Sequence, residues 1–380
     1  MDFSLSSEQQ QLKDSTDKFA IRGYGFSRHQ TTLSRPGHLD PSIWAQMADF
    51  GWLALPLPEA AGGLGGSGVD FSLVAESLGA GMVLEPFIAG LLLPGKLIAF
   101  AGSDVQQQAT LPSLAQGDLH LAVAWAEHNT VQDPSHCETV AERNIDGWLL
   151  KGRKLCVLNA PNAQQLLVSA RTSGETQEEH GISLFMVSTK AHGISLQSYP
   201  VMGGGVGANV VLDHVQLPTD ALLGRVDEGF SALDAALDYA TAAACAQALG
   251  AMGQLLDRTV NYLRVRKQFG VAIGSFQALQ HRAAEMFIEV EQSRSMVLMA
   301  AVRVDSPDTR VRRSSVSAAK AYLCKSAKFV AQQAVQLHGG IGVTEELDVG
   351  HYFRQLTAFG TLYGDRGWHL DRYALLSEVD

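Results

Sequence analysis

Cysteine is scarce in this sequence of 380 residues, and the few cysteines do not cluster. Their wide spacing contains no CxxC pair and no zinc-ligand pattern, which excludes a paired-thiol redox motif and a zinc finger. We therefore expect buried thiols in a reducing compartment. The cysteines are Cys137, Cys156, Cys245 and Cys324.

Long hydrophobic runs are also absent. The most apolar stretch, residues 87–102, is interrupted by Pro94, Gly95 and Lys96. It therefore falls short of the roughly 20 apolar residues that cross a bilayer. Residues 1–8 are polar and acidic, so they lack the basic and then apolar start of a signal peptide. Together these absences predict a cytoplasmic protein without a membrane span.

The sequence has no excess of positive charge. Lys and Arg number 29 against 39 for Asp and Glu, and the formal net charge is -10. This balance argues against nucleic acid and anionic membranes as partners, because both need a basic face. What is present is 46% hydrophobic residues, enough for one large core or two to three smaller ones.

The first segment, residues 1–119, has the pattern of a helical domain. Ser6 followed by Gln9 three residues later is typical of a capping box at a helix start. The glycines of residues 62–66 follow no predicted strand and precede no Lys-Ser/Thr pair. We interpret them as a loop between helices and not as a phosphate cradle.

Residues 120–226 have the pattern of a small β domain. Short runs rich in β-formers alternate with turn signals such as Asp146-Gly147. The glycines between Gly203 and Gly207 lie between two such runs, so they predict a turn and not a dinucleotide-binding fingerprint. The expected strands are residues 121–125, 148–150, 165–169, 182–187 and 209–212.

Residues 227–380 return to a helical period and predict a bundle of about four helices. An alanine-rich helix covers about Phe230 to Leu263, and its small residues let neighbouring helices approach closely. A later helix ends at His338, interpreted as a helix-end cation, with Gly339 as the C-terminal cap. The chain is therefore predicted to be α+β, mainly α, with a helical, a β-barrel-like and a four-helix-bundle domain in that order.

Two motifs mark this last segment. Residues 266–270 read Arg-Lys-Gln-Phe-Gly, and residues 336–342 read Gln-Leu-His-Gly-Gly-Ile-Gly. Both resemble the flavin-contacting motifs of the acyl-CoA dehydrogenase family. The order helical, β, helical matches the fold of that family, and the phrases at residues 51–53 and 152–154 extend the resemblance to the other segments.

The resemblance implies FAD-dependent α,β-dehydrogenation of an acyl-CoA, with an electron-transferring flavoprotein as the acceptor. Arg266 would pair with the pyrophosphate of FAD, and the two glycines after His338 would let the backbone approach it closely. The implied cofactor-binding residues are Arg266, Gln268, Phe269, Gln277, Gln336, Gly339 and Gly340.

The catalytic glutamate of the family is missing. By resemblance its two usual positions fall on Tyr363 and Ala240, and the arginine that contacts CoA falls on Thr241. A tyrosine of pKa ~10 is a poor base near pH 7, and threonine cannot reproduce the arginine fork. Asp365 is the nearest acid, either as a base or as a cap for the helix that contains Trp368.

The side chains that hold the flavin ring in the family are mostly missing too. Residues 126–130 keep only Glu127 of the family's Thr-Glu-Pro-x-Ala-Gly-Ser-Asp loop, and Cys156 stands where the family has a stacking aromatic residue. In the family, the adenosine-diphosphate contacts reach the flavin of a neighbouring subunit, whereas the base, ring and CoA contacts come mainly from the subunit that owns the site. This chain keeps the first set and lacks the second.

This asymmetry predicts a subunit that completes the flavin site of a second acyl-CoA dehydrogenase subunit in an α2β2 heterotetramer. The family contains such assemblies among bacterial dehydrogenases that act on steroid side chains or dicarboxylic acyl chains. Two alternatives stay open, a homomeric enzyme that uses Asp365 as its base and a non-catalytic scaffold. The histidines show no HxxxH or HExxH spacing, so we expect no metal site.

Overall fold

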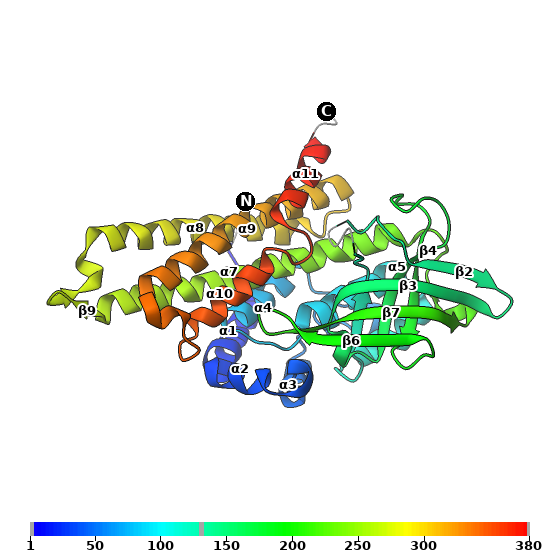
Figure 1. The fold of residues 1–380 in the computed structure, drawn as a ribbon, viewed down its shortest axis with the longest axis horizontal. Helices are drawn as coiled ribbons and strands as arrows, with labels where there is room; N and C mark the ends of the chain where they lie inside the picture. Colours follow the sequence, from blue (N-terminus) through cyan, green and yellow to red (C-terminus); the bar gives the residue numbers. More distant parts are fainter. Residues whose placement is uncertain (1–3, 129–132, 378–380) are drawn as a thin grey trace. The chain divides into compact units, whose positions relative to one another are not determined.

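The computed structural model describes residues 4–128 and 133–377, which form two compact units (Figure 1). The first unit contains the described residues of Met1–Thr31, Ser67–Val83 and Thr241–Asp380, and the second contains those of Thr32–Gly66 and Leu84–Ala240. The boundaries of the three predicted domains, 1–119, 120–226 and 227–380, stay a prediction. Among the described residues, no helix has both the length and the apolar composition needed to cross a membrane.

The first unit is built of helices, and the first of them starts where the sequence predicts. Ser6 Oγ accepts from the backbone N–H of Gln9 at 3.2 Å, and Gln9 Oε1 accepts from the N–H of Ser6 at 3.1 Å. This confirms the capping box. The helices of this unit are α1 (Ser7–Asp17), η1 (Lys18–Tyr24), most of α2 (Gly25–Leu33), α4 (Gly68–Ala80), the larger part of α7 (Gly229–Val265), α8 (Gln277–Arg303), α9 (Thr309–His338), η8 (Gly339–Val343), α10 (Val349–Phe359) and α11 (Arg366–Ser377).

α9 is the central helix of the C-terminal bundle and packs against α8, α10 and α11. In Figure 1, α8 and α9 run side by side. Five apolar residues spaced by four and three form its buried stripe, as the sequence predicts, and burying each leucine contributes about 1.5–3 kcal/mol. The stripe consists of Leu323, Ala327, Val330, Ala334 and Leu337.

Small residues bring α4 and α7 into close contact. A Cβ built on Gly250 of α7 would lie 1.9 Å from the carbonyl oxygen of Glu76, a distance that no real side chain tolerates. α7 is one continuous helix from Gly229 to Val265, which confirms the predicted alanine-rich helix. Its composition lets α4 pack directly against its backbone.

The motif at residues 266–270 forms a hairpin and not part of a helix. Lys267–Gln268 (β9) pairs in antiparallel fashion with Val271–Ala272 (β10). Phe269 and Gly270 form the turn between them, with φ of 54° and 83°. Positive φ at both central positions is the type I′ geometry that suits a two-residue hairpin. A helical period cannot continue through such a turn, so α7 ends at Val265, directly before this motif.

The second unit is built on an eight-stranded sheet with the order β6-β7-β3-β2-β4-β5-β8, and β1 pairs with β4 in parallel. All five expected strands are present. Of the predicted turn residues, Asp146 lies in a turn and Gly147 begins the next strand, whereas Gly203 and Gly204 lie in the turn and bend before the strand that contains Gly207. The strands are β1 (Leu121–Ala124), β2 (Val140–Asn144), β3 (Gly147–Leu158), β4 (Gln165–Arg171), β5 (Ile182–Ser188), β6 (Ile194–Pro200), β7 (Val206–Leu217) and β8 (Leu222–Leu223).

The sequence missed β2, β6 and β8 for physical reasons. β2 has one buried residue and β6 has none, so neither carries the apolar signal of a core strand, and β8 is only two residues long. Helices complete this unit, and the glycines of residues 62–66 form the expected loop. Its helices include η3 (Glu59–Ala61), α3 (Pro41–Asp49), η4 (Phe87–Leu92), α5 (Leu93–Ala101) and α6 (Asp104–Ala115).

Two buried histidines predict that the first unit loses stability in mild acid. His29 and His369 are 3% and 1% exposed. Burial is the main cause that lowers the pKa of His29 to about 4 and that of His369 to about 3. As pH falls below 6.5, these two histidines become protonated in the unfolded chain but stay neutral in the folded chain. Their contribution to stability is therefore present above pH 6.5 and is lost below it.

We expect each of the two histidines to lower the free energy of unfolding by about 2 kcal/mol when the pH falls from 7 to 5. The check is urea unfolding of the wild-type chain and of His29→Gln and His369→Gln at both pH values. Each variant should show a smaller loss between pH 7 and pH 5 than the wild type. Equal losses in all three proteins would contradict the assignment.

Candidate functional site

The C-terminal ends of α7 and α9 lie together in the first unit. The ring of Tyr262, near the end of α7, stacks on the ring of His338, the last residue of α9, with 4.5 Å between the ring centroids. The hairpin at residues 266–270 follows the first helix, and the glycine turn at residues 339–343 follows the second. The structure therefore brings together the two motifs that the sequence singles out.

His338 is not the helix-end cation that the sequence suggests. Its side chain is buried, and Nδ1 donates to the carbonyl oxygen of Ala334 at 2.8 Å. Burial lowers the pKa of His338 below 6.5, although the hydrogen bond to Ala334 acts in the opposite direction. Burial outweighs the attraction between a cation and the helix C-terminus, so a neutral ring stacks on Tyr262 at pH 7.

The predicted cofactor-binding side chains around this junction are all exposed. Phe269 is 91% exposed at the tip of the hairpin. Within the described part of the chain, no carboxylate forms an ion pair with the exposed guanidinium of Arg266. The other exposed side chains of the set are Gln268, Gln277 and Gln336.

The two glycines of the turn face open space. Gly339 has φ of 66°, which glycine adopts without the cost that a side chain would add, and it ends α9 as predicted. Gly340 has no such backbone requirement, and a Cβ on either glycine would meet nothing within 4 Å. Packing among the residues that the structure describes therefore gives no reason for a glycine at position 340.

These features fit the adenosine-diphosphate half of FAD. A guanidinium without an ion-pair partner suits a pyrophosphate, exposed amides suit the adenine, and open glycines allow backbone N–H groups to approach phosphate oxygens. The described residues therefore offer cation, amide and backbone donors from two adjoining turns of one unit.

The segment that matches the family's catalytic position is closed by hydrogen bonds. Tyr363 lies in the left-handed region with φ of 55°, and its carbonyl oxygen accepts from His369 Nε2 at 3.0 Å. Lys320, which is fully buried, donates to the carbonyl oxygen of Phe359 at the end of α10. Asp365 Oδ1 accepts from the backbone N–H of Trp368 at 2.9 Å, so this carboxylate caps α11.

The second matching position for the base is apolar and buried. Ala240 and Thr241 follow one another on α7 and are 0% and 2% exposed. Neither residue is a carboxylate or an arginine, so these two positions supply neither a proton acceptor nor the fork that contacts CoA in the family.

Glu127, the one residue kept from the family's flavin-contacting loop, forms a buried ion pair. Lys154 Nζ lies 2.6 Å from Glu127 Oε1, and both side chains are almost fully buried. Burial raises the pKa of Glu127, but the charge and hydrogen bond of Lys154 outweigh it, and the net pKa is lowered. Asn129 and Thr130 of the same loop lie outside the described residues. The carboxylate of Glu127 is therefore bound to Lys154 inside the second unit, the unit that contains the eight-stranded sheet.

Cys156 is exposed, which corrects the expectation of four buried thiols. It lies where the register of β3 against β7 shifts, and its φ of 48° turns the chain locally. Its backbone N–H donates to Asn209 Oδ1 at 3.3 Å. The irregularity at this position places the residue that replaces the family's aromatic side chain at the surface.

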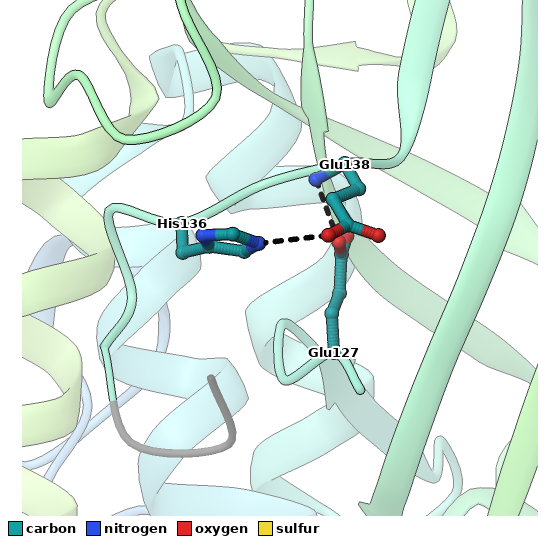
Figure 2. A group of neighbouring side chains, drawn as sticks. All are labelled: Glu127, His136 and Glu138. Carbon is teal, nitrogen blue, oxygen red and sulfur yellow. Dashed lines mark hydrogen bonds and ion pairs between the residues drawn. The ribbon is translucent and has the colours of Figure 1, made fainter. Parts of the chain in front are cut away.

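Glu127, His136 and Glu138 form the group drawn in Figure 2, with potential metal-ligand atoms all within 4.8 Å of one another. The oxygens of Glu127 are already used, because they bind Lys154 and the backbone N–H groups of Glu138 and Thr139 at 2.6 and 3.1 Å. His136 Nε2 lies 3.1 Å from Glu138 Oε1. A metal ion would have to displace Lys154, and we keep the prediction of no metal site.

Sequence reasoning missed Lys320 and His369, which fix the segment around Tyr363. One signal was available for Lys320. It lies four residues after Val316 and three before Leu323, and both of these residues are buried on α9. A lysine in an apolar stripe predicts a buried polar contact, since burying an ammonium without partners is costly. The position of His369 carries no comparable signal.

We predict that Glu127→Gln lowers the free energy of unfolding by about 3–5 kcal/mol, because it leaves the Lys154 ammonium buried without a counter-charge. The measurement is chemical unfolding, monitored by the fluorescence of the second unit. Asp213→Asn is the control, since Asp213 pairs with His214 at an exposed site and should change stability by less than about 1 kcal/mol. Equal effects would show that the pair is not the stabilising contact.

Comparison with known proteins covers nearly the whole chain. The family models of the acyl-CoA dehydrogenase N-terminal, middle and C-terminal domains match residues 6–118, 122–211 and 227–374. YngJ of Bacillus subtilis, a probable acyl-CoA dehydrogenase, is 30% identical over 359 residues, which cover 93% of each chain.

Two further relatives are components of complexes. CarC, a subunit of the caffeyl-CoA reductase-Etf complex of Acetobacterium woodii, is 28% identical over 87% of this chain and 88% of CarC. The ChsE4-ChsE5 complex from Mycobacterium tuberculosis has a TM-score of 0.90 and 25% identity over 100% of both chains. The chain belongs to the acyl-CoA dehydrogenase family, FAD-dependent oxidoreductases that act on acyl-CoA.

Proposed function

We propose that this chain is the subunit that completes a partner's flavin site in a heteromeric acyl-CoA dehydrogenase of α2β2 composition. Its exposed hairpin and glycine turn contact the adenosine-diphosphate half of an FAD whose ring is bound by a catalytic subunit. When bound, FAD would supply the hydride acceptor for the acyl-CoA. The observation that carries this proposal is the contrast between the open cofactor-binding turns and the closed segment around Tyr363.

Each cofactor-binding residue takes a role that its exposure supports. Arg266 pairs with the pyrophosphate, and the backbones of Gly339 and Gly340 donate to its oxygens. Gln268 and Phe269 line the adenine side. Gln277, at the start of α8, and Gln336, in the last turn of α9, supply further hydrogen bonds.

The catalytic base belongs to the partner in this proposal. Tyr363 and Ala240 offer no carboxylate, and Asp365 is engaged as the cap of α11. The likeness to the ChsE4-ChsE5 complex supports an assembly of two different family members. The likeness to CarC, part of a complex with Etf, supports an electron-transferring flavoprotein as the acceptor. We propose a place in lipid or steroid breakdown in the cytoplasm.

We predict that Arg266→Ala weakens FAD binding about tenfold or more in the complex obtained by co-expression with the second family member. A charge-assisted hydrogen bond contributes about 1.5–3 kcal/mol, and about 1.4 kcal/mol corresponds to a factor of ten. Binding is followed by flavin fluorescence on titration of the cofactor-free complex. Arg264→Ala is the control, since this exposed arginine lies at the same helix end outside the proposed contact set.

The same titration separates the alternatives. A non-catalytic scaffold would give equal FAD affinity for both arginine variants and the wild type. A homomeric enzyme would bind FAD and reduce it with acyl-CoA when the chain is purified alone. Either result would contradict the proposed division of the site between two subunits.

We predict that Asp365→Asn leaves the rate of acyl-CoA dehydrogenation by the complex unchanged within about twofold, because asparagine caps a helix as well as aspartate does. If Asp365 were the general base, the same change would lower kcat by about a hundredfold or more. Asp365→Ala should keep the rate but lower stability by about 1 kcal/mol through loss of the cap. The rate is measured with an artificial electron acceptor.

A further inference from the structure

Three residues of α7 and its extension lie on one face at four-residue intervals. They are Arg258, Tyr262 and Arg266, and a spacing of four places side chains above one another on a helix. The backbone N–H of Arg266 donates to the carbonyl oxygen of Tyr262 at 2.9 Å, so the helical repeat still holds at Arg266. The proposed pyrophosphate-binding arginine is therefore the last member of this row.

The first member of the row holds the far end of the segment that contains the glycine turn. Arg258 Nε donates to Asp348 Oδ2 at 2.5 Å, where Asp348 immediately precedes α10. Gln254 also orients Arg258, because Nη1 of Arg258 donates to Gln254 Oε1 at 2.6 Å. The guanidinium also lies over the ring of Tyr352 at 5.3 Å. Several contacts therefore fix the direction of this arginine.

The second member holds the near end. Tyr262 stacks on His338, directly before Gly339, with 30° between the ring planes. The segment from residue 339 to residue 348 is thus attached at both ends to residues one helical turn apart on α7. Within the segment, Glu345 binds Arg354 of α10 at 2.8 and 3.0 Å, a contact that does not set its position relative to α7.

The glycines themselves cannot fix their own position. A Cβ on Gly339 or Gly340 would meet no described atom within 4 Å, so the turn gains little packing at these two residues. Ordering such a turn when a ligand binds costs conformational free energy, and holding it in place beforehand removes part of that cost. The contacts of Arg258 with Asp348 and of Tyr262 with His338 hold the two ends of this segment in place before a ligand binds.

We infer that Arg258 and Tyr262 are positioning residues for the cofactor site, holding the glycine turn beside Arg266 so that both meet the same pyrophosphate. This inference rests on the proposed function, because it assigns the turn to FAD. Tyr262 acts through His338 and Arg258 acts through Asp348, and neither residue needs to touch the cofactor.

The test uses Tyr262→Leu and Asp348→Asn, each with a conservative partner. Tyr262→Phe keeps the stacked ring, and Arg258→Lys keeps a cation opposite Asp348. Two measurements are made: amide hydrogen exchange of residues 339–348 in the full chain alone, and FAD affinity of the co-expressed complex. The exchange measurement needs neither the cofactor nor the partner.

We expect faster exchange of residues 339–348 in Tyr262→Leu and Asp348→Asn. FAD dissociation constants should rise about tenfold for Tyr262→Leu, which corresponds to about 1.4 kcal/mol. Tyr262→Phe should restore both values to within about threefold, and Arg258→Lys should fall between the wild type and Asp348→Asn. Unchanged exchange in both disruptive variants would overturn the inference.

The outcomes also separate this inference from the proposed function. If Arg266→Ala weakens FAD binding but the loosened turn of Tyr262→Leu and Asp348→Asn binds FAD normally, the inference fails and the proposed function stands. If Arg266→Ala has no effect on FAD, the proposed function fails and the positioning role for FAD fails with it. If one disruptive variant does not fold, the other and its conservative partner still decide.

Discussion

The burial of one face of α9 is the constraint on which both parts of the candidate site depend. The apolar stripe that ends at Leu337 fixes the helix in the bundle, and three polar residues of the same helix then act at set places. Lys320 binds the carbonyl oxygen of Phe359, and Ser317 Oγ lies 3.2 Å from His369 Nδ1. At the C-terminal end of α9, the ring of His338 stacks on the ring of Tyr262, which lies on α7 just before the hairpin. A shift of α9 would disturb the closed segment and the open turns together.

The closed segment and the open turns differ in how their polar groups are satisfied. Around Tyr363, two groups that could react are already bonded: the carboxylate of Asp365 caps a helix, and His369 uses both ring nitrogens. At the hairpin and the glycine turn, donors face solvent. A buried polar network that is fully satisfied resists rearrangement, whereas exposed donors remain able to bind a ligand. The physical state of the polar groups therefore supports the same division of roles that the residue identities suggest.

The sequence was sufficient for the elements that carry a strong local signal. The capping box at Ser6, the glycine that ends α9 and the five core strands were predicted, because caps, turns and apolar periods act locally. The polar strands β2 and β6 carried no such signal. His338 was misread, because its charge depends on burial by residues distant in the sequence. Arg258 and Asp348 form a contact across 90 positions, which no period or motif reveals.

The hairpin contains an aromatic residue whose backbone strain is not compensated by burial within the chain. Phe269 adopts a positive φ, which costs a bulky residue on the order of 1–3 kcal/mol, and it gains almost no burial in return because it is 91% exposed. Its one ring contact in the described structure is an edge-on approach to Phe276 at 6.2 Å, which recovers little. Folding of this chain alone therefore maintains a strained, exposed aromatic residue three positions from the guanidinium of Arg266, which has no ion-pair partner among the described residues. The strain and the exposure are both offset if a cofactor and a second subunit cover this turn, which is the condition that the proposed assembly provides.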